Sequence, residues 1–218
     1  MNIKVVQDLI CPWCYIGHHN LDRAIAGWTA EHGGEFELRW LPYQLDPMSP
    51  GTPPQEFRQR FKDRKHATDK QIDAMFERVT HAGAAAGITF RFDLIDVAVD
   101  TLPGHIAIAT TPSGKRPALI QALYRDYFEE GKDIGTAAQI LDAATIAGLD
   151  DHEQTAIVGA LADDAARANV ESQIRQVQAA GVTGVPYFVI DDRFGLSGAQ
   201  PPEAFTQTFA QAHEHALA

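Results

Sequence analysis

The sequence predicts an α/β fold in which a βαβ unit at the start of the chain and a ββα unit at its end flank a large all-helical segment. Two short strand patterns near the N-terminus and two near the C-terminus support this prediction, and helical patterns fill most of the chain between them. The 218 residues suffice for one large domain that carries an insertion, and such a domain can bury a substantial core without disulfides.

The N-terminal unit is predicted from two strand patterns separated by a helix. Residues 1–11 read as a strand because β-branched residues gather there, and a helical pattern then runs to the stop signal at Gly33-Gly34. The segment Phe36–Trp40 alternates apolar and polar residues, which indicates a second strand. Strand, helix and strand in this order are typical of a parallel βαβ unit.

The middle of the chain is predicted to be helical, and strands return only near its end. A proline-rich connection, Pro42–Pro54, leads into this segment, and Thr68 with Gln71 forms a capping-box pattern at the start of one helix. Helices are expected over residues 58–65, 68–87, 105–112, 116–130, 136–147 and 153–180, then strands at Pro186–Ile190 and Arg193–Ser197, and a last helix over Pro201–Ala216. The aromatic residues of 116–130 are expected in the core because they share one helical face.

Composition excludes several classes of protein. The formal net charge is −11, from 29 acidic and 18 basic residues, and no basic block suggests nucleic acid as a partner. No apolar run approaches the roughly 20 residues that a membrane-spanning helix needs. The N-terminus lacks the pattern of a secretory signal, so we expect a cytoplasmic protein. Permanent disulfides are rare in that compartment, which favours a catalytic or sensing role for paired cysteines.

The most informative motif is Cys11-Pro12-Trp13-Cys14, which holds the only two cysteines of the chain. Cys11 lies where the first strand gives way to a helix, and the unpaired N–H groups of a helix start stabilise a thiolate over a thiol. Pro12 suits the first helical turn, where a missing N–H costs nothing. The motif therefore predicts a dithiol that opens and closes as a disulfide.

The helical pattern after the motif distinguishes the two sulfurs. Leu21, Ile25 and Trp28 follow Cys14 on one stripe of a 3.6-residue period, so Cys14 is expected to face the core. Cys11 is expected at the exposed helix start. We therefore assign Cys11 as the attacking nucleophile and Cys14 as the buried resolving thiol.

Three segments together resemble a known family. They are Cys11–Gly17 (Cys-Pro-Trp-Cys-Tyr-Ile-Gly), Gly184–Ile190 (Gly-Val-Pro-Tyr-Phe-Val-Ile) and Ser197–Gln200 (Ser-Gly-Ala-Gln). With them the whole chain resembles the DsbA-like thioredoxin-fold oxidoreductases, specifically the FrnE-like subgroup. The resemblance implies a thioredoxin-like domain formed by residues 1–52 and 180–218, and a helical insertion domain formed by 53–179.

The resemblance also implies roles for residues around the dithiol. Pro186 is expected to be cis and to lie beside the dithiol, with Val185 and Pro186 presenting backbone to a substrate docked as an added strand. Pro12 and Trp13 are expected to set the local environment of the sulfurs. The implied activity is that of a protein disulfide oxidoreductase, and its partner would be a disulfide- or thiol-bearing protein or small molecule.

Some positions depart from relatives. Thioredoxins and periplasmic DsbA proteins carry an acidic residue six positions before the first cysteine, where this chain has Val5; Asp8 is a candidate replacement. Trp13 stands where periplasmic DsbA has histidine, so we expect a less oxidising disulfide. His105, near Asp100-Thr101, resembles a family histidine in the insertion; it either acts over the dithiol or is an ordinary helix-start histidine.

Alternative functions stay open at this level. A metal site could combine Cys11, Cys14 and His18, although no second cysteine pair exists and the other histidines are scattered. His18, His19, His213 and His215 are otherwise expected to be solvated helix residues.

A second alternative shares the fold. Kappa-class glutathione transferases and 2-hydroxychromene-2-carboxylate isomerases are similar, but they use serine at the first active-site position. A third is a chaperone-like module with relic cysteines. An oxidoreductase of this kind needs no bound cofactor, and glutathione is an open alternative as its co-substrate. We expect no membrane partner, and a homodimer is compatible with the sequence.

Overall fold

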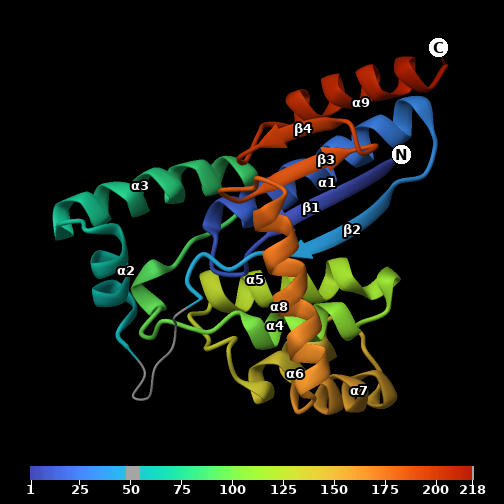
Figure 1. Ribbon diagram of the computed structural model, residues 1–218. Coiled ribbons are helices and arrows are strands. Elements are labelled where there is room, and N and C mark those ends of the chain that lie inside the picture. Colours follow the sequence, from blue (N-terminus) through green and yellow to red (C-terminus); the bar gives the residue numbers. More distant parts are fainter. Residues whose placement is uncertain (48–54, 218) are drawn as a thin grey trace. The chain divides into compact units, whose positions relative to one another are not determined.

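The chain forms two compact units in the computed structural model, which describes residues 1–47 and 55–217 (Figure 1). The sheet unit comprises Met1–Tyr43 and Gln173–Ala218, and the helical unit comprises Gln44–Ser172. Part of the expected Pro42–Pro54 connection, and with it the expected boundary at residues 52 and 53, lies outside the described residues.

The sheet unit is built on one four-stranded sheet with the order β2-β1-β3-β4. The strands are β1 (Asn2–Gln7), β2 (Glu37–Pro42), β3 (Tyr187–Ile190) and β4 (Phe194–Ser197). β1 pairs in parallel with β2 and antiparallel with β3, and β3 pairs antiparallel with β4. The predicted βαβ and ββα units are therefore confirmed, and they join through the β1–β3 pair.

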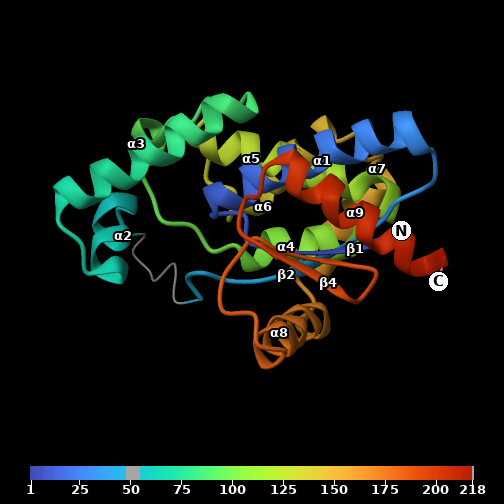
Figure 2. The same cartoon turned by 90° about the horizontal axis from the view of Figure 1, so that it is seen from above.

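Two helices of the sheet unit cover one face of the sheet. They are α1 (Pro12–His32) and α9 (Pro202–Leu217), which lie side by side in both views (Figure 1, Figure 2). Phe188 of β3 is fully buried, and its ring contacts Phe205 of α9 edge-on with centroids 4.8 Å apart. The alternation of β3 thus places Phe188 and Ile190 in the core between sheet and helices.

Helix α1 begins and ends as its sequence predicts. Cys11 is its N-cap residue, Pro12 occupies the first turn, and the chain leaves the helix at Gly33 with φ +68°. The Gly33 N–H donates to the Thr29 carbonyl at 2.9 Å, which satisfies one of the last free carbonyls of the helix.

The helical unit follows the predicted order of elements. Its helices are α2 (Phe57–Lys65), α3 (Asp69–Ala86), α4 (Leu102–Thr110), α5 (Arg116–Phe128), α6 (Ala137–Ile146) and α7 (Asp151–Leu161), with short 3₁₀ turns at Phe92–Leu94 and Ser113–Lys115. Tyr124, Tyr127 and Phe128 of α5 are buried, which confirms the aromatic face of this helix as core.

The prediction of one helix over residues 153–180 is wrong. Helix α7 ends at Leu161, and α8 (Asp164–Ala179) begins after a break; its residues from Gln173 onward belong to the sheet unit. The Asp163 carboxylate accepts a hydrogen bond from the Ala165 N–H at 2.9 Å. An aspartate that caps a new helix start in this way favours a restart over continuation of the old helix.

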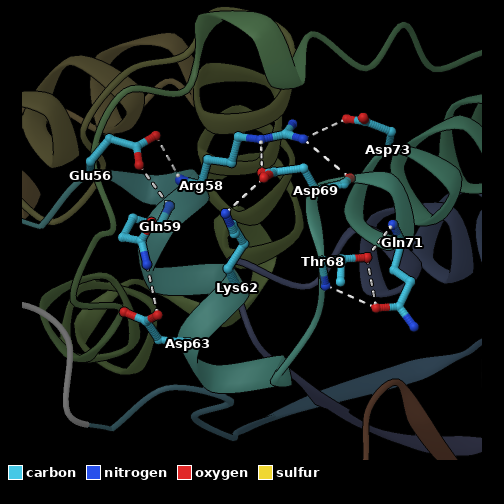
Figure 3. A network of polar contacts seen from close by, with 9 residues as sticks. All are labelled: Glu56, Arg58, Gln59, Lys62, Asp63, Thr68, Asp69, Gln71 and Asp73. Carbon is cyan, nitrogen blue, oxygen red and sulfur yellow. Dashed lines mark hydrogen bonds and ion pairs between the residues drawn. The ribbon is translucent and has the colours of Figure 1, made fainter.

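A surface network of polar contacts joins α2 to the start of α3 (Figure 3). The Arg58 guanidinium donates to the Asp73 carboxylate at 2.7 Å and to Asp69 at 3.3 Å. Thr68 and Gln71 form the predicted capping box. These ion pairs are solvent-exposed, so they orient the two helices and add little stability. No helix in the described parts of the chain is long and apolar enough to cross a bilayer.

Candidate active site

The dithiol lies in the turn between β1 and α1. The Cys11 N–H donates to the Asp8 carbonyl at 3.1 Å, and the Cys11 carbonyl accepts the N–H of Cys14 at 2.9 Å and that of Tyr15 at 3.3 Å. Cys11 therefore occupies the N-cap of α1, as predicted, at the positive end of the helix dipole. Both cysteines are free thiols. Pro12 and Trp13, between them, are half-buried.

Cys14 faces the core, as the apolar stripe predicts. Its side chain is fully buried. Burial raises the pKa of the Cys14 thiol well above its usual range, and a hydrogen bond with Cys11 and the charge of Cys11 raise it further. A buried thiol in this position stays protonated until a group nearby accepts its proton.

The expectation that Cys11 stands exposed at the helix start is wrong. Its side chain is only 3 % exposed. The reason is a segment distant in sequence: the Cys11 Sγ donates to the carbonyl oxygen of Val185 across 3.5 Å. The loop before β3 therefore lies against the sulfur, and sequence reasoning on the helix alone could not reveal this contact.

The Val185–Pro186 bond is cis, as the resemblance implies. Behind it, the Pro186 carbonyl accepts the N–H of Gly198 at 2.8 Å, and the Gly198 carbonyl accepts that of Gln200 at 2.8 Å. The Asn20 side chain on α1 then donates to the Gln200 carbonyl at 2.9 Å. These hydrogen bonds link helix α1 to Pro186 through the turn at residues 198–200. Pro186 directly follows Val185, whose carbonyl faces Cys11.

Asn20 is a residue that sequence reasoning missed. It is 8 % exposed, although it is polar. Six residues separate it from Cys14, which places it off the apolar stripe of the helix, so no helical pattern predicts its burial. A buried polar side chain requires a hydrogen-bond partner, and the Gln200 carbonyl supplies it.

Asp8 lies next to the resolving thiol. Its side chain is fully buried, and in the described residues of the sheet unit it is the one buried carboxylate. The Asp8 backbone N–H acts to lower the pKa of Cys14, whereas the charge of Asp8 acts to raise it. Val5, at the position where relatives carry an acid, is buried in the sheet between Trp40 and Phe188.

The expectation of a solvated His18 is also wrong. The ring is 4 % exposed and stacks on Trp40 of β2 with centroids 4.5 Å apart. His18 follows Cys14 by four residues and so shares its inward face. Burial lowers the pKa of His18 to about 3, and the charge of His19 adds to this effect. His18 is therefore neutral near pH 7.

His19 is half-buried, with its ring edge-on to Tyr15, whereas His213 and His215 are exposed as expected. Within residues 1–47 and 55–217, no group of three or more His, Cys, Asp or Glu side chains could hold a metal ion. Cys11, Cys14 and His18 therefore do not form the ligand set considered from the sequence.

His105 lies in the helical unit, in the first turn of α4. The ring is buried, and its backbone N–H donates to the Thr101 carbonyl at 3.0 Å. Asp100 caps the same turn by accepting the Leu102 N–H at 2.9 Å. Burial raises the pKa of Asp100, against the opposing effect of the Leu102 N–H. A role of His105 over the dithiol stays a prediction.

A small cavity of about 160 Å³ opens beside the loop that carries Val185. Its lining is the segment Ala180–Gly184 that precedes Val185, together with Tyr187 and Ser197. All of these residues belong to the sheet unit. The cavity is smaller than the roughly 300 Å³ of a typical ligand pocket, so it can hold one group of a substrate.

A βαβ–ββα sheet, a dithiol at the start of its first helix and a cis-proline loop against the first sulfur define a thioredoxin-fold protein. The family model described as DSBA-like thioredoxin domain matches residues 2–210. The chain belongs to this DsbA-like family, and its fold is the DsbA-like thioredoxin fold with a helical insertion.

Individual relatives agree with this assignment. A probable DsbA oxidoreductase from Streptomyces coelicolor is 31 % identical, with 98 % of this chain and 90 % of that chain covered and a TM-score of 0.84. The protein YwbO of Bacillus subtilis (strain 168), itself uncharacterised, is 24 % identical over 96 % of both chains. The cytosolic disulfide reductase DsbM from Pseudomonas aeruginosa, solved with GSH, shares the fold at 20 % identity, 97 % and 100 % coverage and a TM-score of 0.68.

Proposed function

We propose that this protein is a thiol–disulfide oxidoreductase that cycles Cys11 and Cys14 between dithiol and disulfide. Its substrate is a protein or small molecule that carries a thiol or a disulfide. The observation that carries the proposal is the asymmetry of the pair: Cys11 caps the helix and faces the Val185 carbonyl at 3.5 Å, whereas Cys14 is fully buried behind it.

The chemistry proceeds through a mixed disulfide. The Cys11 thiolate attacks one sulfur of a substrate disulfide, the substrate S–S bond breaks, and the departing thiolate takes up a proton. The Cys14 thiol then loses its proton and attacks the Cys11 sulfur, which releases the second substrate thiol and closes the Cys11–Cys14 disulfide. The dithiol loses two electrons and the substrate disulfide gains them; the reverse sequence oxidises a substrate dithiol.

The roles of the two sulfurs follow from their surroundings. Cys11 lies at the N-cap of α1, where the positive end of the helix dipole favours negative charge on its sulfur. Cys14 has a raised pKa and stays a thiol until the mixed disulfide has formed. Pro12 and Trp13, half-buried between the cysteines, set the polarity around them.

Substrate docking is proposed at the loop of Val185 and Pro186. We place an extended substrate segment along Val185 and Pro186, because the Val185 carbonyl lies beside the Cys11 sulfur. The cavity lined by Ala180–Gly184 can take one side group of such a substrate. We include glutathione as a co-substrate, because DsbM, which has this fold, was solved with GSH. A homodimer is compatible with this arrangement.

We place the protein in the FrnE-like subgroup and in the cytoplasm. The motifs around Cys11, Pro186 and Ser197 support the subgroup. The cytosolic DsbM with the same fold supports the location. The fold is also that of a 2-hydroxychromene-2-carboxylate isomerase, at 14 % identity and a TM-score of 0.70, but cysteine at both positions favours electron exchange over isomerisation.

A trapping experiment tests the proposal. The Cys14→Ser variant lacks the resolving thiol, so it should accumulate a mixed disulfide at Cys11 when mixed with intact insulin, which carries disulfides, or with glutathione disulfide. The matched Cys11→Ser variant keeps only the buried thiol and should form no adduct in the same time. Adducts of equal yield on both variants, or on neither, contradict the assigned roles.

A further inference from the structure

Gly17 on α1 lies against the strand that follows the cis-proline. A Cβ atom added at Gly17 would stand 3.1 Å from Cγ of Pro186 and 3.1 Å from Cζ of Phe188. Such contacts are tighter than nine in ten real Cβ contacts, so a side chain at position 17 would require Pro186 and Phe188 to shift by a few tenths of an ångström.

Glycine at this position is unfavourable for the helix itself, because glycine in a helix interior loses more backbone entropy on folding than alanine. The same helix contains Gly27, which is exposed and has nothing within 4 Å of an added Cβ. The two glycines therefore differ. A side chain at Gly17 would contact Pro186 and Phe188, whereas a Cβ at Gly27 would have no neighbour within 4 Å. They form a matched pair in one helix.

Gly17 belongs to the face of α1 that holds the redox site together. It follows Cys14 by three residues, about one helical turn, and Asn20 follows by three more. Cys14 is the buried thiol, Gly17 contacts Pro186, and Asn20 holds the turn that binds the Pro186 carbonyl. Along this face, one helix sets both the dithiol and the position of the proline loop.

We propose that Gly17 is a positioning residue that lets the Val185 carbonyl reach the Cys11 sulfur. The inference rests on the proposed function, because it concerns the balance between the dithiol and the disulfide. A side chain at position 17 would push Pro186 away from α1, and the adjacent Val185 carbonyl would move with it. The hydrogen bond from Cys11 Sγ to that carbonyl, now at 3.5 Å, would lengthen.

This hydrogen bond exists only when Cys11 carries its proton, since a disulfide sulfur cannot donate. It therefore stabilises the dithiol form relative to the disulfide form. Consider the exchange in which the protein dithiol and one glutathione disulfide give the protein disulfide and two glutathione molecules. Loss of the hydrogen bond should raise the equilibrium constant of this exchange by about two- to fivefold, as for a weak S–H···O hydrogen bond.

The experiment compares wild type, Gly17→Ala and the control Gly27→Ala in glutathione redox buffers, with the fraction oxidised read as mass after thiol alkylation. We expect the equilibrium constant of Gly17→Ala to shift toward the disulfide by the factor given above. The equilibrium constant of Gly27→Ala should equal that of wild type. Thermal unfolding is measured in parallel, because a structural role alone would change stability and leave the redox equilibrium in place.

A third variant separates folding from positioning. Gly17→Ala combined with Phe188→Leu removes the ring that an added methyl would meet, with Phe188→Leu alone as its reference. The added methyl should cost less stability relative to Phe188→Leu than Gly17→Ala costs relative to wild type. The Pro186 contact remains, so the equilibrium constant should still shift toward disulfide.

An unchanged equilibrium in folded Gly17→Ala overturns the inference, and so does a folding defect that Phe188→Leu does not relieve. If wild type itself shows no two-electron transition, the proposed function fails and not the role of Gly17.

Discussion

The Cys11 sulfur and the Val185 carbonyl lie 3.5 Å apart although 174 positions separate them in the chain. This contact brings the two parts of the candidate site together: the start of α1 and the loop that precedes β3. It also explains why Cys11 is nearly as buried as Cys14. In the proposed function, a substrate approaches Cys11 along the Val185–Pro186 loop.

Selective alkylation of the two thiols is the first prediction. Iodoacetamide added to the native reduced protein should modify Cys11 first, because a thiolate is the reacting species and the pKa of the buried Cys14 thiol is well above its usual range. Cys14 should react only after unfolding in guanidinium chloride. Peptide mapping after timed alkylation gives the order, and earlier modification of Cys14 contradicts the assignment.

The Asp8→Asn variant tests the buried carboxylate as proton acceptor for Cys14. When the reduced protein reacts with 5,5′-dithiobis(2-nitrobenzoate), attack by Cys11 releases one thionitrobenzoate and attack by Cys14 releases a second. Asp8→Asn should slow the second release by roughly a hundredfold at pH 7, as for loss of a general base, and leave the first nearly unchanged.

Glu31→Gln, at an exposed position of α1, is the control for Asp8→Asn and should match wild type in both phases. Equal slowing of both phases would point to a general disturbance of the turn before Cys11. An unchanged second phase would exclude Asp8 as the acceptor.

Asn20→Ala removes the link between α1 and the 198–200 turn. The Gln200 carbonyl would lose its partner at 2.9 Å, so the free energy of unfolding should fall by about 1 kcal/mol. Urea unfolding measures the change, with Thr29→Ala on the exposed side of α1 as the control. A loss no larger than that of Thr29→Ala would show that the link does not stabilise the fold.

His18 should make stability depend on pH in the acid range. Its pKa is about 3 in the folded protein against 6.5 when unfolded, so between these values only the unfolded chain takes up the proton. The free energy of unfolding therefore falls as the pH drops below 6.5, by roughly 2 kcal/mol at pH 5 from this group alone. Above pH 6.5 the group contributes no pH dependence.

His18→Phe keeps an aromatic ring against Trp40 and removes the proton site, so it should lose less stability than wild type between pH 7 and pH 5. Urea unfolding at both pH values gives the comparison, in which the contributions of other groups cancel. Equal losses in the two proteins would show that His18 is not held neutral by burial.

Local patterns predicted the elements and one half of the site. The stripe of Leu21, Ile25 and Trp28 placed Cys14 in the core, because helical periodicity is a property of neighbouring residues. The same holds for the capping box at Thr68 and for the stop at Gly33.

The remaining features depend on residues that are distant in sequence. The burial of Cys11 comes from Val185, and the contact that requires Gly17 comes from Pro186 and Phe188. A histidine in an amphipathic helix is usually solvated, and only the position of Trp40 on β2 makes His18 a stacked core residue. Helical spacing places His18 on the inward face of α1, but the stacking partner comes from another element.

The most direct test of the central claim is the redox state of Cys11 and Cys14 across a series of glutathione buffers, read as mass after thiol alkylation. The account predicts one two-electron transition in which both thiols disappear together into the Cys11–Cys14 disulfide. Thiols that never pair, or a single glutathione that stays attached to Cys11, would contradict the oxidoreductase assignment.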